Sequence, residues 1–133
     1  NRFQDSRGVI TFNNEFDASL IKRIYTIENT DLDFVRGWQG HQIEQRWFAC
    51  MKGSFEISVI QLNDFENPVT NQAMQRFTPT GEKLTYLSVP PMSITTIQAK
   101  KKNSKLWVGS DYGINEIDDE YRFPLLTFKE DKT

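Results

Sequence analysis

His41 is the side chain best suited to proton transfer, and it is the only histidine in the chain. The ordinary pKa of histidine lies close to neutrality, so an imidazole can act as a general base and as a general acid. His41 follows a glycine-containing turn at the beginning of a strand-like segment. A lone histidine in a half-buried strand is more often a structural residue, and residue chemistry alone leaves that alternative open.

The composition narrows the class of protein. The chain has 133 residues, which is one domain with room for a hydrophobic core. It has 16 lysine and arginine residues against 18 aspartate and glutamate residues, a net charge of -2, so no basic excess indicates binding to nucleic acid. It contains no long apolar run that could span a membrane, so we expect no membrane contact.

The single cysteine, Cys50, lies in an apolar run and cannot form a disulfide within the chain. It is therefore expected to be a buried thiol in a reducing compartment, and we predict a cytoplasmic protein. The first residue is Asn1 rather than methionine, which leaves open that the chain is a piece of a longer protein.

Short strands separated by turns must position these residues. Strand-like runs occur at 9–12, 21–27, 34–43, 46–51, 54–62, 84–89, 93–99 and 105–110. The segment 63–80 is rich in loop signals, and 114–133 is polar and acidic. Many short strands at regular spacing predict an all-β, antiparallel sandwich or barrel, and their number favours a jelly roll.

Two of these runs carry further residues of interest. The alternation in 21–27 places Arg23 and Tyr25 on one face of a strand. Gly37 and Gly40 lie inside the next run. Glycines within a strand indicate a bulge or the close approach of a ligand, and the sequence leaves both alternatives open.

The stretch around His41 resembles the first cupin motif. That motif has two histidines separated by one residue, then a glutamate after four more residues and a glycine after six more. The corresponding positions here hold Gln39, His41, Arg46 and Gly53. The second cupin motif resembles 90–95, where the usual histidine is Thr95.

Within the cupins, the chain is similar to the nucleotide-sugar 3,4-ketoisomerases and 3,5-epimerases of deoxysugar biosynthesis. The similar pieces extend from about Asp5 to about Tyr121 and are 5–8, 21–25, 36–37 with His41, 89–91 and 110–112. The resemblance implies a single-domain jelly-roll cupin with a core at 5–121 and a C-terminal tail at 122–133. It also implies an isomerase of a nucleotide-linked 4-keto-6-deoxyhexose, in deoxysugar or surface polysaccharide biosynthesis.

The residues at the cupin metal positions predict a protein without a metal ion and without another cofactor. Only His41 is a good ligand there, and Arg46 places a fixed positive charge where the cation would lie. The sugar ketoisomerases and epimerases also work without a metal. The epimerases have their base at the position of Gln39, whereas the ketoisomerases use that of His41. The resemblance therefore favours 3,4-ketoisomerisation over 3,5-epimerisation.

The resemblance and the residue types together suggest a role for each site residue. His41 is the expected base, and Tyr25 and Arg46 are expected to donate hydrogen bonds to an enediolate. Arginine contacts a diphosphate through paired hydrogen bonds, so the arginines that match the family are expected to bind it. The expected substrate-binding residues are Arg7, Arg23, Arg36, Gln39 and Trp38. For any single arginine, a surface charge or a salt bridge is about as frequent a role.

The expected partners are a nucleotide-diphosphate sugar and a second copy of the chain. The resemblance implies a homodimer, and the strand at 9–12 can extend the edge of a neighbour's sheet. Two other classes remain open. One is a catalytically inactive cupin that binds a nucleotide sugar, and the other is a regulatory domain fused to a transferase.

Overall fold

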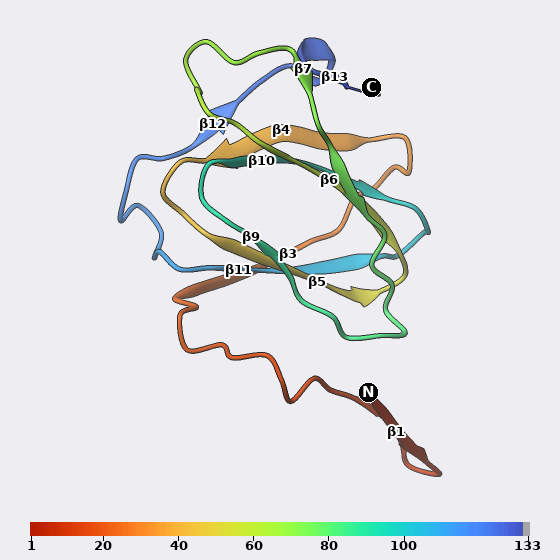
Figure 1. Ribbon diagram of the computed structural model, residues 1–133. Helices are drawn as coiled ribbons and strands as arrows, with labels where there is room; N and C mark the ends of the chain where they lie inside the picture. The colour runs from red at the N-terminus through yellow and green to blue at the C-terminus, as the bar shows by residue number, and fades with distance from the viewer. Residues whose placement is uncertain (132–133) are drawn as a thin grey trace.

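Two antiparallel sheets face each other, and the chain passes repeatedly from one to the other (Figure 1). The computed structural model describes residues 1–131. The larger sheet has the order β12 (Tyr121–Arg122), β4 (Val35–His41), β10 (Ser93–Ala99), β6 (Phe55–Gln61) and β8 (Gln75–Phe77). The smaller sheet has the order β3 (Arg23–Ile27), β11 (Lys105–Ser110), β5 (Arg46–Lys52) and β9 (Leu87–Val89). This arrangement confirms the predicted all-β, antiparallel fold.

The remaining short elements lie outside the two sheets. β1 (Arg2–Asp5) and β2 (Gly8–Thr11) form an antiparallel hairpin. β7 (Asn71–Gln72) pairs in parallel with β13 (Lys129–Glu130), and the 3-10 helix η1 (Leu125–Thr127) precedes β13. Within residues 1–131, no helix has the length and apolar character needed to cross a membrane.

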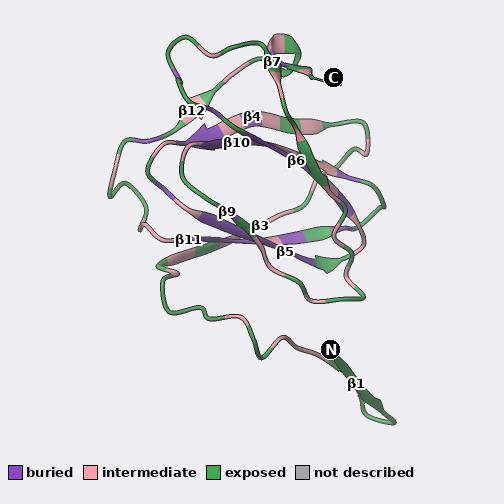
Figure 2. Ribbon diagram, viewed as in Figure 1, coloured by how far each residue is buried: buried purple, intermediate pink, exposed green. Residues whose placement is uncertain are grey.

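The space between the sheets is filled by apolar side chains that alternate along the central strands. Phe48 of β5, Ile57 of β6 and Val108 of β11 are completely buried there. Figure 2 shows that the buried residues concentrate on the strands that face one another. Cys50 belongs to the same core, which confirms the predicted buried thiol, and burial raises its pKa.

The outer face of the larger sheet is covered by the C-terminal segment. Phe128 is buried against Trp38 of β4, with the two ring centroids 5.8 Å apart. Ile94 and Ile97 of β10 are both buried although they point to opposite faces, because this sheet is covered on both sides. The segment expected to form a tail therefore packs on the sheet, and residues 132–133 of that tail lie outside the described residues.

Gly37 and Gly40 of β4 permit the close approach of a neighbouring strand, and the pairing with that strand has a bulge or irregularity between Thr95 and Ile97, which agrees with one of the two alternatives predicted for these glycines. A Cβ atom at Gly37 would collide with the carbonyl oxygen of Thr95, and one at Gly40 with that of Ser93. Both of these neighbours belong to β10, which pairs with β4. Gly37 also has a φ of +128°, a conformation that favours glycine. The glycines thus bring the strand that carries His41 against the centre of the larger sheet.

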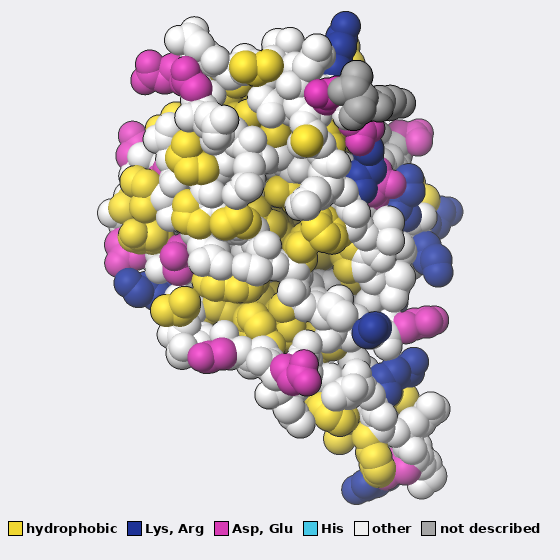
Figure 3. Space-filling model, viewed as in Figure 1, with side chains coloured by type: hydrophobic (Ala, Val, Ile, Leu, Met, Phe, Trp, Pro, Cys, Tyr) yellow, Lys and Arg dark blue, Asp and Glu magenta, His cyan; other side chains and the backbone are white. Residues whose placement is uncertain are grey.

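The hairpin of β1 and β2 projects away from the two sheets (Figure 1). Strand β2 agrees with the predicted strand at 9–12, whereas β1 has no counterpart among the predicted strands. Apolar side chains of the hairpin are exposed, with Phe3 at 53% and Ile10 at 61%. The space-filling view shows hydrophobic atoms along this projecting part (Figure 3). A homodimer formed through this strand stays a prediction.

Candidate active site

A cavity of about 490 Å³ lies where β4 ends and β5 begins, with walls from both sheets. This volume is within the usual range for sites that bind small molecules. Six of the eight site residues expected from the sequence line the cavity: Arg23, Tyr25, Arg36, Gln39, His41 and Arg46. They come from β4 of the larger sheet and from β3 and β5 of the smaller sheet, and Thr95 of β10 lies beside β4 on the wall formed by the larger sheet.

His41 is the last residue of β4, and a contact from the C-terminal part of the chain holds its ring. Its Nδ1 lies 2.9 Å from the backbone carbonyl oxygen of Asp119. A carbonyl oxygen only accepts hydrogen bonds, so Nδ1 carries the proton of the neutral imidazole. The lone pair of that tautomer lies on Nε2, which is therefore the nitrogen that can accept a proton.

The surroundings of His41 favour its neutral form. Burial lowers the pKa of His41 below its ordinary value, and the positive charge of Arg46 lowers this pKa further. The negative charge of Glu44 and the hydrogen bond to the Asp119 carbonyl act in the opposite direction but do not reverse the shift. The imidazole is thus uncharged at neutral pH, which is the form a general base requires.

Asp119 also fixes the turn that follows His41, a role that the sequence did not predict. Its carboxylate accepts hydrogen bonds from the backbone N–H groups of Gln42 at 2.9 Å, Ile43 at 2.9 Å and Glu44 at 2.8 Å. Hydrogen bonds to an ionised acceptor are about twice as strong as neutral ones. One buried residue therefore holds both the imidazole ring and the turn behind it.

Arg46 places a buried positive charge beside the imidazole. A guanidinium nitrogen donates to the hydroxyl of Thr95 at 3.1 Å and to the carbonyl oxygen of Gln39 at 3.4 Å. Burial lowers the pKa of Arg46, whereas Tyr25 and Glu44 raise it. Among residues 1–131, no group of three histidine, cysteine, aspartate or glutamate side chains is arranged to hold a metal ion. The site therefore combines a neutral imidazole with a fixed cation.

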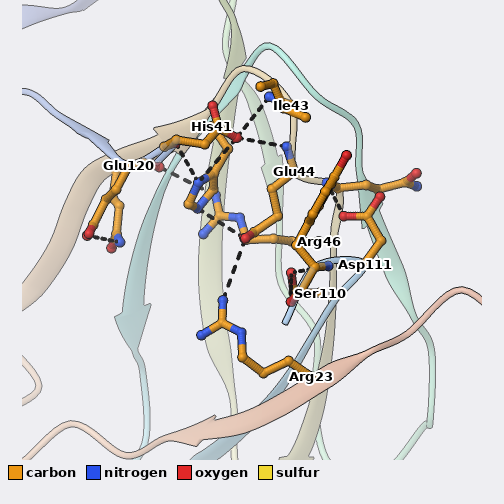
Figure 4. Close-up of polar contacts among 12 residues, drawn as sticks. Arg23, His41, Ile43, Glu44, Arg46, Ser110, Asp111 and Glu120 are labelled. Carbon is orange, nitrogen blue, oxygen red and sulfur yellow. Dashed lines mark hydrogen bonds and ion pairs between the residues drawn. The ribbon is translucent and has the colours of Figure 1, made fainter. Parts of the chain in front are cut away.

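Arg23 and Tyr25 face the same cavity from β3, as the alternation in this strand predicted. The guanidinium carbon of Arg23 is 5.2 Å from the centre of the Tyr25 ring. A guanidinium nitrogen of Arg23 is 3.6 Å from a carboxylate oxygen of Glu44. Figure 4 shows Arg23 pointing up to this carboxylate, with His41 and Arg46 close by. Arg23 is thus engaged inside the protein.

A second cavity of about 440 Å³ adjoins the first along β4. Arg36, Gln39 and Arg122 line both cavities, and Arg122 is a site residue that the sequence did not indicate. The remaining predicted binding residue on β4, Trp38, lines only the second cavity, and its indole N–H donates to the carbonyl oxygen of Leu125 at 3.3 Å. The two cavities together form a continuous surface with two exposed arginines at their junction.

Arg7 lies apart from both cavities. It is in the turn of the projecting hairpin, where its guanidinium pairs with Asp5 at 2.6 Å and its side chain is 83% exposed. The structure does not bring Arg7 to the other predicted residues within the described chain. Its expected contact with a diphosphate therefore stays a prediction.

Comparison with known proteins identifies the fold. No protein-family model and no curated protein matches the chain. Among solved structures, a variant of the 3,4-ketoisomerase QdtA from Thermoanaerobacterium thermosaccharolyticum, in complex with TDP-4-keto-6-deoxyglucose, has a TM-score of 0.69 and 21% identity over 92% of this chain and 83% of that chain. A 3,4-ketoisomerase from Helicobacter canadensis has a TM-score of 0.62 and 26% identity over 87% of this chain and 81% of that one.

The epimerase branch is similar as well. The dTDP-4-dehydrorhamnose 3,5-epimerase from Bacillus anthracis, solved with TDP and pyrophosphate bound, has a TM-score of 0.70 and 12% identity over 90% of this chain and 73% of that one. The chain therefore has the fold of the dTDP-sugar 3,4-ketoisomerases and 3,5-epimerases. This confirms the resemblance that the motifs around His41 indicated.

Proposed function

We propose that this chain is a sugar isomerase that moves the keto group of a nucleotide-linked 4-keto-6-deoxyhexose from C4 to C3. The observation that carries the proposal is the orientation of the imidazole. The carbonyl of Asp119 holds Nδ1, which leaves Nε2 of His41 as a neutral base at the wall of the cavity. The cupin metal positions beside it hold Gln39, Arg46 and Thr95, which are poor ligands for a transition metal, so the proposed reaction uses none.

The proposed reaction moves one proton from C3 to the base and returns one at C4. Nε2 of His41 removes the proton from C3, and the electron pair of that bond forms the double bond of an enediolate with its charge on the C4 oxygen. Arg46 and Tyr25 line the same cavity and supply donors for that charge. The C4 oxygen then gains a proton, the C3 hydroxyl loses one, and the imidazolium gives its proton to C4.

The arginines at the junction of the two cavities indicate how the substrate lies. The hexose occupies the cavity of about 490 Å³ beside His41, and the diphosphate lies at the junction, where Arg36 and Arg122 line both cavities. Guanidinium groups bind phosphate oxygens with paired hydrogen bonds. The nucleotide base extends into the second cavity, where the rings of Phe34 and Phe123 offer surfaces for stacking.

The structural neighbours support this class of substrate, and one residue favours ketoisomerisation over epimerisation. QdtA was solved with TDP-4-keto-6-deoxyglucose, and the Bacillus anthracis epimerase with TDP. By resemblance, the epimerases have their base at the position of Gln39. The amide of Gln39 donates to Glu120 at 2.7 Å and cannot act as a base. 3,5-Epimerisation is the second candidate, and binding of a nucleotide sugar without conversion is the third.

The test is proton NMR of a TDP-4-keto-6-deoxyhexose incubated with the protein in deuterated water. Ketoisomerisation moves the carbonyl to C3 and introduces deuterium at C4 of the product, or at C3 of 4-keto substrate that is re-formed, because the base exchanges its proton with solvent. Deuterium at both C3 and C5, with the carbonyl still at C4, would instead assign 3,5-epimerisation. If the sugar binds but is not changed, both reactions are rejected, and the third candidate remains, a protein that binds a nucleotide sugar without converting it.

Arg36→Ala should weaken binding of TDP by about 1.5–3 kcal/mol, the usual contribution of hydrogen bonds to a charged group. The difference should shrink as salt concentration rises, since part of it is Coulombic. Isothermal titration calorimetry at low and high salt measures it. Arg76→Ala is the matched control, because Arg76 on β8 pairs with Glu130 at 2.7 Å and lines neither cavity. Equal affinity in the Arg36 variant and the control would make Arg36 structural.

The assembly and the setting of the enzyme belong to the same proposal. We place it as a homodimer in polysaccharide biosynthesis, as the resemblance implies, and in the cytoplasm, because its single cysteine indicates a reducing compartment. The exposed Phe3 and Ile10 of the projecting hairpin support a second copy, because exposed apolar strands favour pairing with another chain.

A further inference from the structure

Glu44 is a buried carboxylate that faces the proposed base. It lies in the turn between β4 and β5, three positions after His41, and its side chain is 7% exposed. Its Oε2 is 3.3 Å from Nε2 of His41, and its Oε1 is 3.6 Å from a guanidinium nitrogen of Arg23. Figure 4 shows the carboxylate between these two side chains. The reaction described above gives Glu44 no role.

The contact between Glu44 and His41 becomes an ion pair only when the imidazole is protonated. The two atoms are at ion-pair distance, yet Oε2 has no hydrogen-bond partner among residues 1–131. The lone pair of Nε2 is therefore not engaged by the carboxylate. A buried acceptor without a partner is destabilising and uncommon, so it calls for an explanation. A partner that exists only during the reaction would explain it.

Resting on the function proposed above, we infer that Glu44 is a positioning residue whose carboxylate is the counter-charge of the imidazolium that forms on His41. When Nε2 takes the proton from C3, the C3–H electron pair stays with the substrate and the ring becomes a cation beside Oε2. The proton remains on His41 and returns to C4, so Glu44 neither gains nor loses a proton. Without Glu44, a buried cation would have to form next to Arg46 with less compensation.

The charges around the ring make Glu44 the main compensating group. The titratable groups that surround it are Glu44, Arg46, Arg23, Asp119, Tyr25 and Glu120. Asp119 is also acidic, but its carboxylate is 3.9 Å from Nδ1 and is shared by three backbone N–H groups. The charge of Glu44 raises the pKa of His41 more than that of Asp119 does. The charge of Glu44 thus opposes the lowering of the His41 pKa by Arg46.

The test is a titration of the only histidine in the chain. Because there is one histidine, the imidazole signals in ¹⁵N-labelled protein belong to His41 without ambiguity. Glu44→Gln keeps the size of the side chain and removes its charge, so the imidazolium is less stable and the midpoint of the titration should fall to lower pH. The same variant should lower kcat by up to about tenfold, because an opposite charge shifts a pKa by about one unit or more and one unit is a tenfold change in the stability of the imidazolium. The acid limb of the pH–kcat profile should move in the same direction as the midpoint.

Glu82→Gln is the matched control for the loss of one negative charge. Glu82 is exposed and follows Gly81, which lies against Lys52 at the end of β5 opposite the cavity. This variant should keep the parental midpoint and the parental kcat. A midpoint in Glu44→Gln that equals or exceeds the parental one would overturn the inference.

Glu44→Asp is a second variant that tests the inference if Glu44→Gln does not fold. If circular dichroism shows that Glu44→Gln does not fold, Glu44→Asp replaces it. In that variant the charge lies one methylene further from Nε2, so a lowered midpoint supports the inference and an unchanged midpoint rejects it. The titration is made without substrate. Failure of the deuterium experiment would therefore reject the proposed function, whereas failure of the titration would reject only the role of Glu44.

Discussion

His41→Asn should lower turnover of the 4-keto sugar by about a hundredfold or more, the usual contribution of a positioned acid–base group. Asparagine can still donate a hydrogen bond to the carbonyl of Asp119, which His41 contacts at 2.9 Å, so the fold should persist. Nucleotide binding should also persist, because Arg36 and Arg122 are unchanged. Turnover is measured by NMR of the sugar, and binding by calorimetry with TDP.

The pH dependence of the parent protein is part of the same expectation. Its kcat should fall as pH decreases, because protonation of His41 removes the base. Burial and Arg46 lower the pKa of His41, so this loss should begin below the pH at which free histidine titrates, about 6.5. If His41→Asn exchanged substrate protons at nearly the parental rate, His41 would not be the base. Tyr25, which lines the same cavity, would then be the next candidate.

Arg46→Met should lower kcat by about a hundredfold or more, because it removes a preorganised donor from the site where charge develops. Methionine fills a similar volume without charge. Losing the cation should also raise the pKa of His41 relative to the parent, since Arg46 lowers it. The acid limb of the pH–kcat profile should therefore move to higher pH. Kinetics across a range of pH measure both effects in one experiment.

Two comparisons separate this role of Arg46 from a structural one. Arg46→Lys keeps a positive charge and should recover the position of the acid limb, with only part of the rate. Arg46→Met should unfold at a lower temperature than the parent, because the carbonyl of Gln39 and the hydroxyl of Thr95 lose their buried donor, so its kinetics are measured well below that temperature. A variant that melts much earlier, yet has an unshifted acid limb, would assign Arg46 to the fold.

Strands whose own sequence contains alternating side chains and flanking turn residues were predictable. β10 and β11 occupy 93–99 and 105–110, as predicted, because alternating side chains and flanking turns are local signals. Short strands at the sheet edges were less predictable. β9 begins at Leu87 rather than at 84, and the loop-rich 63–80 contains β7 and β8. Such strands consist of two or three residues whose pairing depends on the neighbouring strand.

The site was predictable where its residues lie in the motif around His41 or alternate along β3, as Arg23 and Tyr25 do. The motif around His41 predicted Gln39 and Arg46 as site residues, because both lie within five positions of His41 in the sequence. Asp119 is 78 positions from His41, in an acidic segment without a pattern that distinguishes it. Arg122 reaches the cavity because β12 pairs with β4, a contact that no local signal indicates. The outward position of Arg7 likewise depends on the direction of the hairpin.

The separation of 78 positions between His41 and Asp119 also determines when, during synthesis of the chain, the imidazole becomes oriented for catalysis. The strand that carries His41 leaves the ribosome well before its sheet partner β10 and before the segment that carries Asp119. Contacts between such distant segments form late, because each requires closure of a long loop. Until then, the imidazole has neither a fixed tautomer nor the burial that lowers its pKa. A nascent chain can thus contain β3, β4 and β5, with the six predicted residues of the cavity, and still lack an oriented base.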